Sequence, residues 1–244
     1  MSNELVSVNL NQLPTTGLSV NSDIFQAVAK SGSFLDRLQL YTKGAAIDNG
    51  LISPGHYGVP RGDDVIQDLG NEIDILPLCC RVKALDMRDR DNIITNYDPT
   101  SEAFKVIKEL GDQSNSGCMY GPTFLIFERG TGAFYEFFCG TSSTRKEATN
   151  IGVYLPKSAE DAEQLSLRLN RPVGIAPEPC TLKVKYVKKP TYGWHVPVCV
   201  LCSTPITNLP STEVIVEEIN KFMALKNTEI EKIEEADAPK KRAR

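Results

Sequence analysis

TFLIFERGTGAFYEFFC, residues 123–139, contains two aromatic-rich runs on either side of a short segment, Arg129-Gly130-Thr131-Gly132. Apolar and aromatic runs joined by a few residues that include glycine are typical of a β-hairpin. The pattern therefore predicts paired strands over 123–128 and 133–139. Because side chains alternate between the two faces of a strand, one set of these side chains must face the core and the other must face away from it.

Three more strands are predicted on either side of this hairpin. Residues 73–85, IDILPLCCRVKAL, form a long strand-like run. Pro77 within it favours an edge position or a bulge, because proline has no N–H to donate to a neighbouring strand. Residues 181–188 and 195–202 are two further strand-like runs, joined by a turn through Pro190 and Gly193.

Helices are predicted where apolar residues recur every three to four positions. Ser158 is the expected N-cap of one of them, with Asp161 completing a capping box. The spacing over 23–41 predicts two short helices or one broken helix, whereas the many glycines and prolines of 44–63 predict a loop. Including the helix that Ser158 caps, the other helices are expected over 99–110, 142–150, 158–169 and 212–225.

The order of these elements favours an α+β fold that is mainly β. One long strand, two hairpins and a helix before the last hairpin suit a five-stranded OB-like barrel with inserted and flanking helices. A mixed α+β sheet would produce the same order of elements. We expect residues 23–225 to form this single domain, with residues 1–22 as a flexible N-terminal arm and residues 226–244 as a disordered charged C-terminal tail.

The composition is that of a folded protein of one domain with appendages. The chain has 244 residues, 41% hydrophobic residues and a formal net charge of −4. No apolar run approaches the 18 residues of a membrane-spanning helix, and the N-terminus lacks the pattern of a secretory signal, so we expect a cytoplasmic protein without a membrane partner. Seven cysteines, an odd number, sit mostly in apolar runs. We expect them to be reduced and buried.

The sequence lacks the usual signatures of catalysis. It contains only two histidines, His56 and His195, and no nucleophile-elbow, zinc-protease or P-loop motif. Cys199 and Cys202 have the spacing of half a zinc site, but valines flank them, and in a strand they would point to opposite faces. We therefore expect a non-enzymatic protein with no cofactor and no metal site.

Residues 180–204, CTLKVKYVKKPTYGWHVPVCVLCST, reverse the overall charge of the chain. The segment has four lysines, three large aromatic residues and no acidic residue. Lysines contact phosphates and aromatic rings stack on bases, so the combination is typical of a surface that binds a single-stranded nucleic acid. The alternative is that the aromatic side chains pack under helices and the lysines only increase solubility. The residues expected at the interface are Arg81, Lys83, Tyr120, Tyr135, Phe137, Arg145, Lys146, Lys183, Lys185, Tyr186, Lys188, Tyr192 and Trp194.

Four segments together resemble a group of bacteriophage proteins labelled as single-stranded-DNA-binding proteins. They are 31–41 (SGSFLDRLQLY), 55–86 (beginning GHYGVPRGDD), 116–148 (beginning SGCMYGPTFLIF) and 192–206 (YGWHVPVCVLCSTPI). The resemblance implies a phage replication or recombination protein in the host cytoplasm, with single-stranded DNA and other replication or recombination proteins as partners. It transfers no binding residues to this chain.

Two other functions remain open at this point. A phage structural or assembly protein would also lack catalytic motifs, and it would use its terminal arms to hold neighbouring copies in a homo-oligomer. A redox or zinc-dependent enzyme would be built on Cys199 and Cys202.

Overall fold

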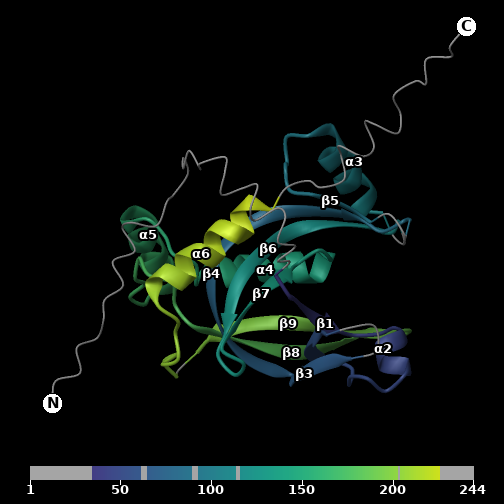
Figure 1. Ribbon diagram of the computed structural model, residues 1–244, viewed down its shortest axis with the longest axis horizontal. Helices are drawn as coiled ribbons and strands as arrows, with labels where there is room; N and C mark the ends of the chain where they lie inside the picture. The colour runs from purple at the N-terminus through teal and green to yellow at the C-terminus, as the bar shows by residue number, and fades with distance from the viewer. Residues whose placement is uncertain (1–34, 62–64, 90–92, 114–115, 203, 226–244) are drawn as a thin grey trace, which may run out of the picture.

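The computed structural model of the protein describes residues 35–61, 65–89, 93–113, 116–202 and 204–225 (Figure 1). In these residues the fold is α+β, with nine strands in one sheet and five helices. The strands are β1 (Arg37–Tyr41), β2 (His56–Pro60), β3 (Ile66–Gly70), β4 (Glu72–Asp86), β5 (Ile94–Asn96), β6 (Cys118–Glu128), β7 (Ala133–Phe138), β8 (Cys180–Lys188) and β9 (Gly193–Leu201). The helices are α2 (Ala45–Asp48), α3 (Glu102–Gly111), α4 (Ser142–Gly152), α5 (Ala159–Leu169) and α6 (Thr212–Ala224).

The sheet is mixed and open. Its strand order is β3-β2-β1-β7-β6-β4-β8-β9, and β5 pairs with β4 off this path. The β1–β7 pair is parallel, and the other pairs of the described strands are antiparallel. The predicted hairpins are confirmed as β6–β7 and β8–β9, and the predicted long strand is confirmed as β4.

The expected five-stranded OB-like barrel is wrong. Four strands that the sequence analysis did not predict, β1, β2, β3 and β5, belong to the sheet, and β1 to β3 extend it beyond β7 instead of closing it on β9. The two ends still approach each other through side chains, since the Tyr57 hydroxyl donates to the carbonyl of Lys183 at 3.3 Å. The sheet is therefore strongly curved without being a closed barrel.

Two of the unpredicted strands contradict specific expectations. Residues 37–41 are strand β1 and not helix, because Leu38 and Leu40 alternate with polar neighbours and pack in the core. Residues 56–60 are strand β2 and not loop, because Tyr57 and Val59 are fully buried on either side of Gly58. A Cβ at Gly58 would lie 2.6 Å from the Ile52 side chain, so glycine is required here by packing and does not indicate a turn.

Strand β4 carries the bulge that Pro77 indicated, although the strand is central and not at an edge. The register with β6 shifts between Pro77 and Cys79. Side chains of the strand alternate between the two faces of the sheet, so β4 contributes to two cores. Ile73 and Ile75 pack in one core, and Leu76 and Leu78 pack in another.

The predicted helices α3 to α6 are confirmed, with ends set by capping residues. Ser101 accepts a hydrogen bond from the N–H of Phe104 at the start of α3, and Ser158 accepts one from the N–H of Asp161 at the start of α5. Thr141 and Thr144 form a full capping box at α4. Such caps satisfy N–H groups that have no partner within the helix.

Helices lie on both faces of the sheet. Figure 1 shows α4 between the β6–β7 part of the sheet and the β8–β9 hairpin, so the sheet curves around this helix. The largest core lies there, and it includes Ala148 and Ile151 of α4. On the other face, α6 buries Ile215 and Phe222 against Leu125 and Phe127 of β6. A third core lies between α3 and the far ends of β4 and β6.

A buried carboxylate joins the central strands. Glu136 of β7 accepts hydrogen bonds from Lys83 of β4 at 2.8 Å and from Thr123 of β6 at 3.0 Å. Arg37 of β1 lies 3.6 Å from its second oxygen. The side chains of Lys83 and Glu136 are only 1% and 4% exposed. One carboxylate thus connects four adjacent strands.

Several expectations lie at the edges of what the structure describes. The N-terminal arm, the C-terminal tail and the helical part expected over residues 23–34 lie outside the described residues. Among the helices that are described, none is both long and apolar enough to cross a membrane. All seven cysteines are free of disulfides, and four of them are buried.

Removing the charge of Glu136 should strongly destabilise the fold. In Glu136→Gln the Lys83 ammonium stays buried without its carboxylate, and breaking a buried pair in this way costs about 3–5 kcal/mol. We expect the free energy of unfolding, measured by urea titration, to fall by about that amount.

The matched control is Glu102→Gln on α3. The Glu102 side chain is 83% exposed and pairs with Lys105 at 3.3 Å, so the expected loss is below about 1 kcal/mol. Equal losses in the two variants would show that the Glu136 carboxylate does not hold the strands together.

Candidate nucleic-acid interface

Aromatic rings are exposed at the turn end of the β8–β9 hairpin. The rings of Tyr192 and Trp194 are stacked, with centroids 5.4 Å apart and an interplanar angle of 23°. Tyr192 is 62% exposed and Trp194 is partly exposed. The indole Nε1 of Trp194 donates to the Ser143 hydroxyl at 3.2 Å, which holds the ring against the first turn of α4.

Tyr186 lies on the opposite face of the same hairpin and is 55% exposed. Its ring is 4.9 Å from that of His195, the cross-strand partner of Tyr186. A Cβ on Gly193 would lie 2.0 Å from the Tyr186 hydroxyl oxygen, so the Tyr186 side chain covers the backbone of this glycine. An aromatic side chain that packs over a glycine on the next strand stabilises the pairing at a point where the glycine contributes no side chain.

Basic side chains surround these rings. Lys185, Lys188 and Lys189 are exposed, and none of them forms an ion pair within the described residues. Lys185 is on the face of Trp194, because Val187 pairs with Trp194 and Lys185 lies two residues from Val187. Lys146 is exposed on α4, one helical turn after Ser143.

Lys183 is less available than the lysines nearer the turn. It shares a face with Lys185, as its spacing predicts, but its ammonium lies 3.0 Å from Glu72 of β4. Both side chains are about half exposed, so solvent screens this pair.

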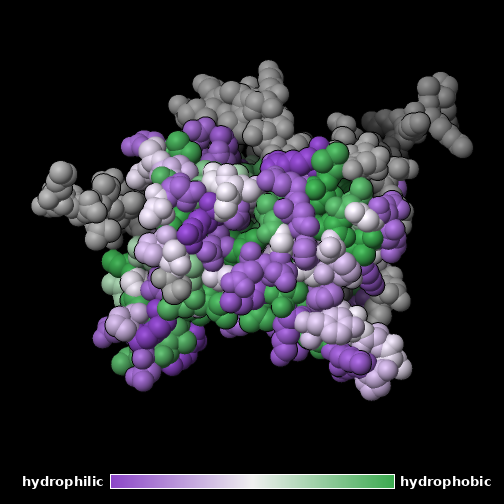
Figure 2. All heavy atoms as spheres, turned by 90° about the horizontal axis from the view of Figure 1, so that it is seen from below, coloured by the Kyte–Doolittle hydropathy of each residue, from purple (hydrophilic) through white to green (hydrophobic). Residues whose placement is uncertain are grey.

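Figure 2 views the molecule from the side on which β8, β9 and β3 lie in Figure 1, and hydrophilic and hydrophobic surfaces alternate there.

Four of the expected interface residues are used inside the protein. Tyr135 and Phe137 are buried in the core around α4, and Lys83 is buried against Glu136. The Arg81 guanidinium donates to the carbonyls of Phe222 and Met223 at the end of α6 and lies 3.9 Å from the ring centroid of Tyr97. Burial lowers the pKa of Arg81, and nearby Tyr97 and Glu136 oppose this effect.

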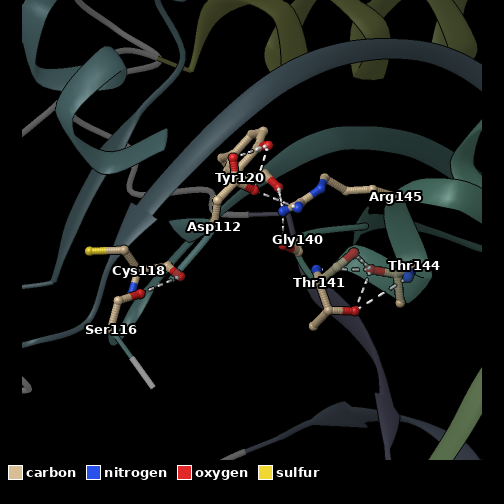
Figure 3. A network of polar contacts seen from close by, with 8 residues as sticks. All are labelled: Asp112, Ser116, Cys118, Tyr120, Gly140, Thr141, Thr144 and Arg145. Carbon is tan, nitrogen blue, oxygen red and sulfur yellow. Dashed lines mark hydrogen bonds and ion pairs between the residues drawn. The ribbon is translucent and has the colours of Figure 1, made fainter. Parts of the chain in front are cut away.

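Tyr120 and Arg145 belong to a polar network between α3, β6 and α4 (Figure 3). The Arg145 guanidinium donates to the carbonyls of Tyr120 and Gly140 at 3.1 Å each, and to Asp112 at 3.0 Å. It also lies 4.0 Å from the Tyr120 ring centroid, and the Tyr120 hydroxyl donates to Asp112 at 2.9 Å. Desolvation and the bond to Asp112 raise the pKa of Tyr120. This arginine fastens α4 to the sheet.

The structure therefore divides the expected interface into two groups. Arg81, Lys83, Tyr120, Tyr135, Phe137 and Arg145 have internal roles, whereas Lys146, Lys183, Lys185, Tyr186, Lys188, Tyr192 and Trp194 lie on or beside the β8–β9 hairpin. Sequence reasoning did not include Lys189 or Ser143 among the site residues. Lys189 could have been found from its place in the basic run, but the bond between Ser143 and Trp194 joins residues 51 positions apart.

The described residues contain no group of three or more side chains suited to hold a metal ion. Cys199 is buried in the core around α4, and Cys202 follows the end of β9, where its thiol donates to the carbonyl of Thr204. Burial raises the pKa of Cys79 to about 12 and that of Cys80 to about 11, so both thiols stay protonated at neutral pH.

Comparison with known proteins gives no relative. No protein-family model, no curated protein and no solved structure matches the chain. The functional argument therefore depends on the residues and their geometry.

Arg145→Gln separates a structural role from a binding role. The change removes charged hydrogen bonds to two carbonyls and to Asp112, and hydrogen bonds to charged groups contribute about 1.5–3 kcal/mol each. We expect the free energy of unfolding to fall by about 2 kcal/mol, while affinity for a single-stranded oligonucleotide stays within about twofold of wild type. A loss of affinity in protein that remains folded would return Arg145 to the interface.

Proposed function

We propose that the protein binds single-stranded DNA without sequence specificity and that it does so without catalysing a reaction. The hairpin interface consists of Lys146, Lys185, Tyr186, Lys188, Lys189, Tyr192 and Trp194. The observation that carries this proposal is the stacked pair of Tyr192 and Trp194 beside lysines that form no ion pair, in a chain whose net charge is −4.

The interface would act by stacking and by charge. Each base stacked on an aromatic ring contributes roughly 1–3 kcal/mol, and every base has a face that can stack. Each lysine that meets a phosphate releases condensed counterions, which makes the affinity depend on salt. Sequence readout requires hydrogen bonds to base edges, whereas this interface consists of rings that stack on any base and of lysines that meet phosphates. The chemistry thus favours binding of all sequences alike.

The biological setting is part of the proposal. We propose phage replication or recombination as this setting, which is the role implied by the resemblance of residues 31–41, 55–86, 116–148 and 192–206 to phage proteins labelled as single-stranded-DNA-binding proteins. In this role the protein would protect single strands in the host cytoplasm, and its partners would include other replication or recombination proteins.

A phage structural or assembly protein is the second candidate, and one surface favours it. Leu167 on α5 is 79% exposed, and an apolar side chain this exposed is available to pack against another copy of the chain. Sedimentation that detects an oligomer without nucleic acid, in a protein that binds no oligonucleotide, would favour assembly over DNA binding.

The first test is a titration of the protein with an oligo-dT strand, followed by tryptophan fluorescence. Trp194 is the only tryptophan of the chain and belongs to the interface. We expect quenching that saturates, weakens as salt rises and persists when duplex DNA is added as competitor. No change in fluorescence, together with no mobility shift, would contradict the proposal.

Tyr192→Leu should remove one stacking surface and keep Trp194 as the reporter. We expect a loss of about 1–3 kcal/mol, which is roughly 5- to 150-fold in affinity. The control is Tyr192→Phe, which keeps the ring for stacking and removes only the hydroxyl, so its affinity should match that of wild type. The same loss in both variants would mean that stacking at the hairpin is not the cause.

Replacing both Lys185 and Lys188 by alanine should weaken binding of all sequences alike. Two lost phosphate contacts should make the slope of log K against log salt shallower by about 1.4, at roughly 0.7 for each contact with a single strand. The control is Lys105→Ala on α3, which lies far from the hairpin (Figure 1). An unchanged slope in the double variant would exclude these two lysines as phosphate ligands.

A further inference from the structure

An open groove of about 470 Å³ lies between the end of α4 and the face of α5. Its apolar part includes Leu155, Pro156 and Leu165, and two cations, Lys157 and Arg168, border it. Gly152, the last residue of α4, contributes backbone without a side chain. A groove lined by apolar side chains and by two cations suits a ligand that has both a flat apolar group and a negative charge.

Helix α4 connects this groove with the hairpin interface. Ser143 in the first turn of α4 holds Trp194, and Thr149 and Gly152 near its end border the groove. Eleven residues of α-helix span about 16 Å. Ser143, Lys146 and Asn150 follow one another at spacings of three and four, so they lie along one face of the helix.

The acidic side chains nearest to this path already have partners. Glu147 on α4 accepts a hydrogen bond from the N–H of Cys199 at 2.6 Å. Asp161 borders the groove, and its carboxylate accepts a hydrogen bond from the Ser158 hydroxyl at 2.7 Å. The path along α4 therefore offers hydroxyl, amide and ammonium groups to a polyanion.

Lys157 and Arg168 differ in how firmly they are held. The Lys157 ammonium donates to the carbonyl of Leu155 at 2.6 Å, and burial lowers its pKa, while Glu178 opposes this effect. Arg168 is exposed in the last turn of α5 and forms no ion pair within the described residues. Arg168 is thus the better phosphate ligand and the better site for a test.

We propose that the groove between α4 and α5 binds a nucleotide of the same single strand that stacks on the hairpin. A phosphate lies against Arg168 and Lys157, and the base packs on Leu155, Pro156 and Leu165. The strand runs along α4 between the two places. This inference rests on the proposed function, and it deepens that function by adding a second contact point, which sets the length of strand that one protein covers.

The test uses oligo-dT strands of about 4 to 16 nucleotides, the range of site sizes found for a different class of single-strand-binding module, the OB fold. Trp194 fluorescence reports occupation of the hairpin for every length. For the wild type, we expect affinity to rise with length until the strand reaches the groove and then to level off. In Arg168→Glu the short strands should bind as in wild type, and the long strands should lose about five- to tenfold.

Gly152→Phe tests the groove by its shape. A Cβ at Gly152 meets no atom within 4 Å, so a larger side chain fits the backbone and fills the groove. We expect affinity in this variant to level off at the shorter length, as in Arg168→Glu. The control is Lys105→Glu on α3, which makes the same change of charge away from the path and should leave the length dependence as in wild type.

The outcomes distinguish the two proposals. If the wild type binds no oligonucleotide of any length, the proposed function is wrong. If the wild type binds and both groove variants keep its full length dependence, the groove is not part of the site. A loss that is equal at all lengths would also reject the groove, because it would place the effect at the hairpin or in the fold.

Discussion

The carboxylate of Glu136 is the interaction on which the centre of the sheet depends. It is shared by Lys83, Thr123 and Arg37, which come from three other strands. Burial of apolar side chains stabilises any strand register that places them in the core. A buried carboxylate destabilises the fold unless hydrogen-bond donors lie within reach of its oxygens, so it restricts the register. The β1–β7 pair has only two residue pairs in register, one of them between Arg37 and Glu136. The ion pair thus selects the position of β1, and β1 in turn carries β2 and β3.

The sequence predicted the elements that are strongly patterned and missed those that depend on tertiary packing. The β6–β7 hairpin, β8–β9 and the capped helices have local signals. Strand β2 has no such local signal, because a glycine at position 58 is typical of a turn. Only the structure shows that Gly58 is needed for packing, since a Cβ there would lie 2.6 Å from the Ile52 side chain. The barrel prediction failed because it counted five strands: β1 was assigned to a helix, β2 to a loop, and the residues of β3 to no element, although these three strands carry the sheet past β7.

The candidate site could be predicted from the sequence only where its side chains lie next to a turn, because residues beside a turn are exposed whichever face of the strand is buried. Tyr192 and Trp194 lie at the tip of a hairpin, so their exposure follows from the turn at Pro190 and Gly193. Alternation alone could not say which face of β7 is buried, and the faces chosen for Tyr135 and Phe137 were wrong. Arg81 and Arg145 bind backbone carbonyls of distant elements. No local pattern marks such a partner, so a basic residue in a sequence is not by itself a ligand for phosphate.

Helix α4 determines how the hairpin can be used. An edge strand with free N–H groups invites another strand to pair with it, and the protein partner would then be a peptide. Here the Glu147 carboxylate accepts a hydrogen bond from the N–H of Cys199 in β9, and the Ser143 hydroxyl accepts one from the indole N–H of Trp194. The first contact blocks strand addition at that point of the edge, and the second holds a ring in place beside lysines that form no ion pair. The hairpin is therefore suited to bind through side chains, and stacking on a nucleic acid needs side chains and no backbone pairing.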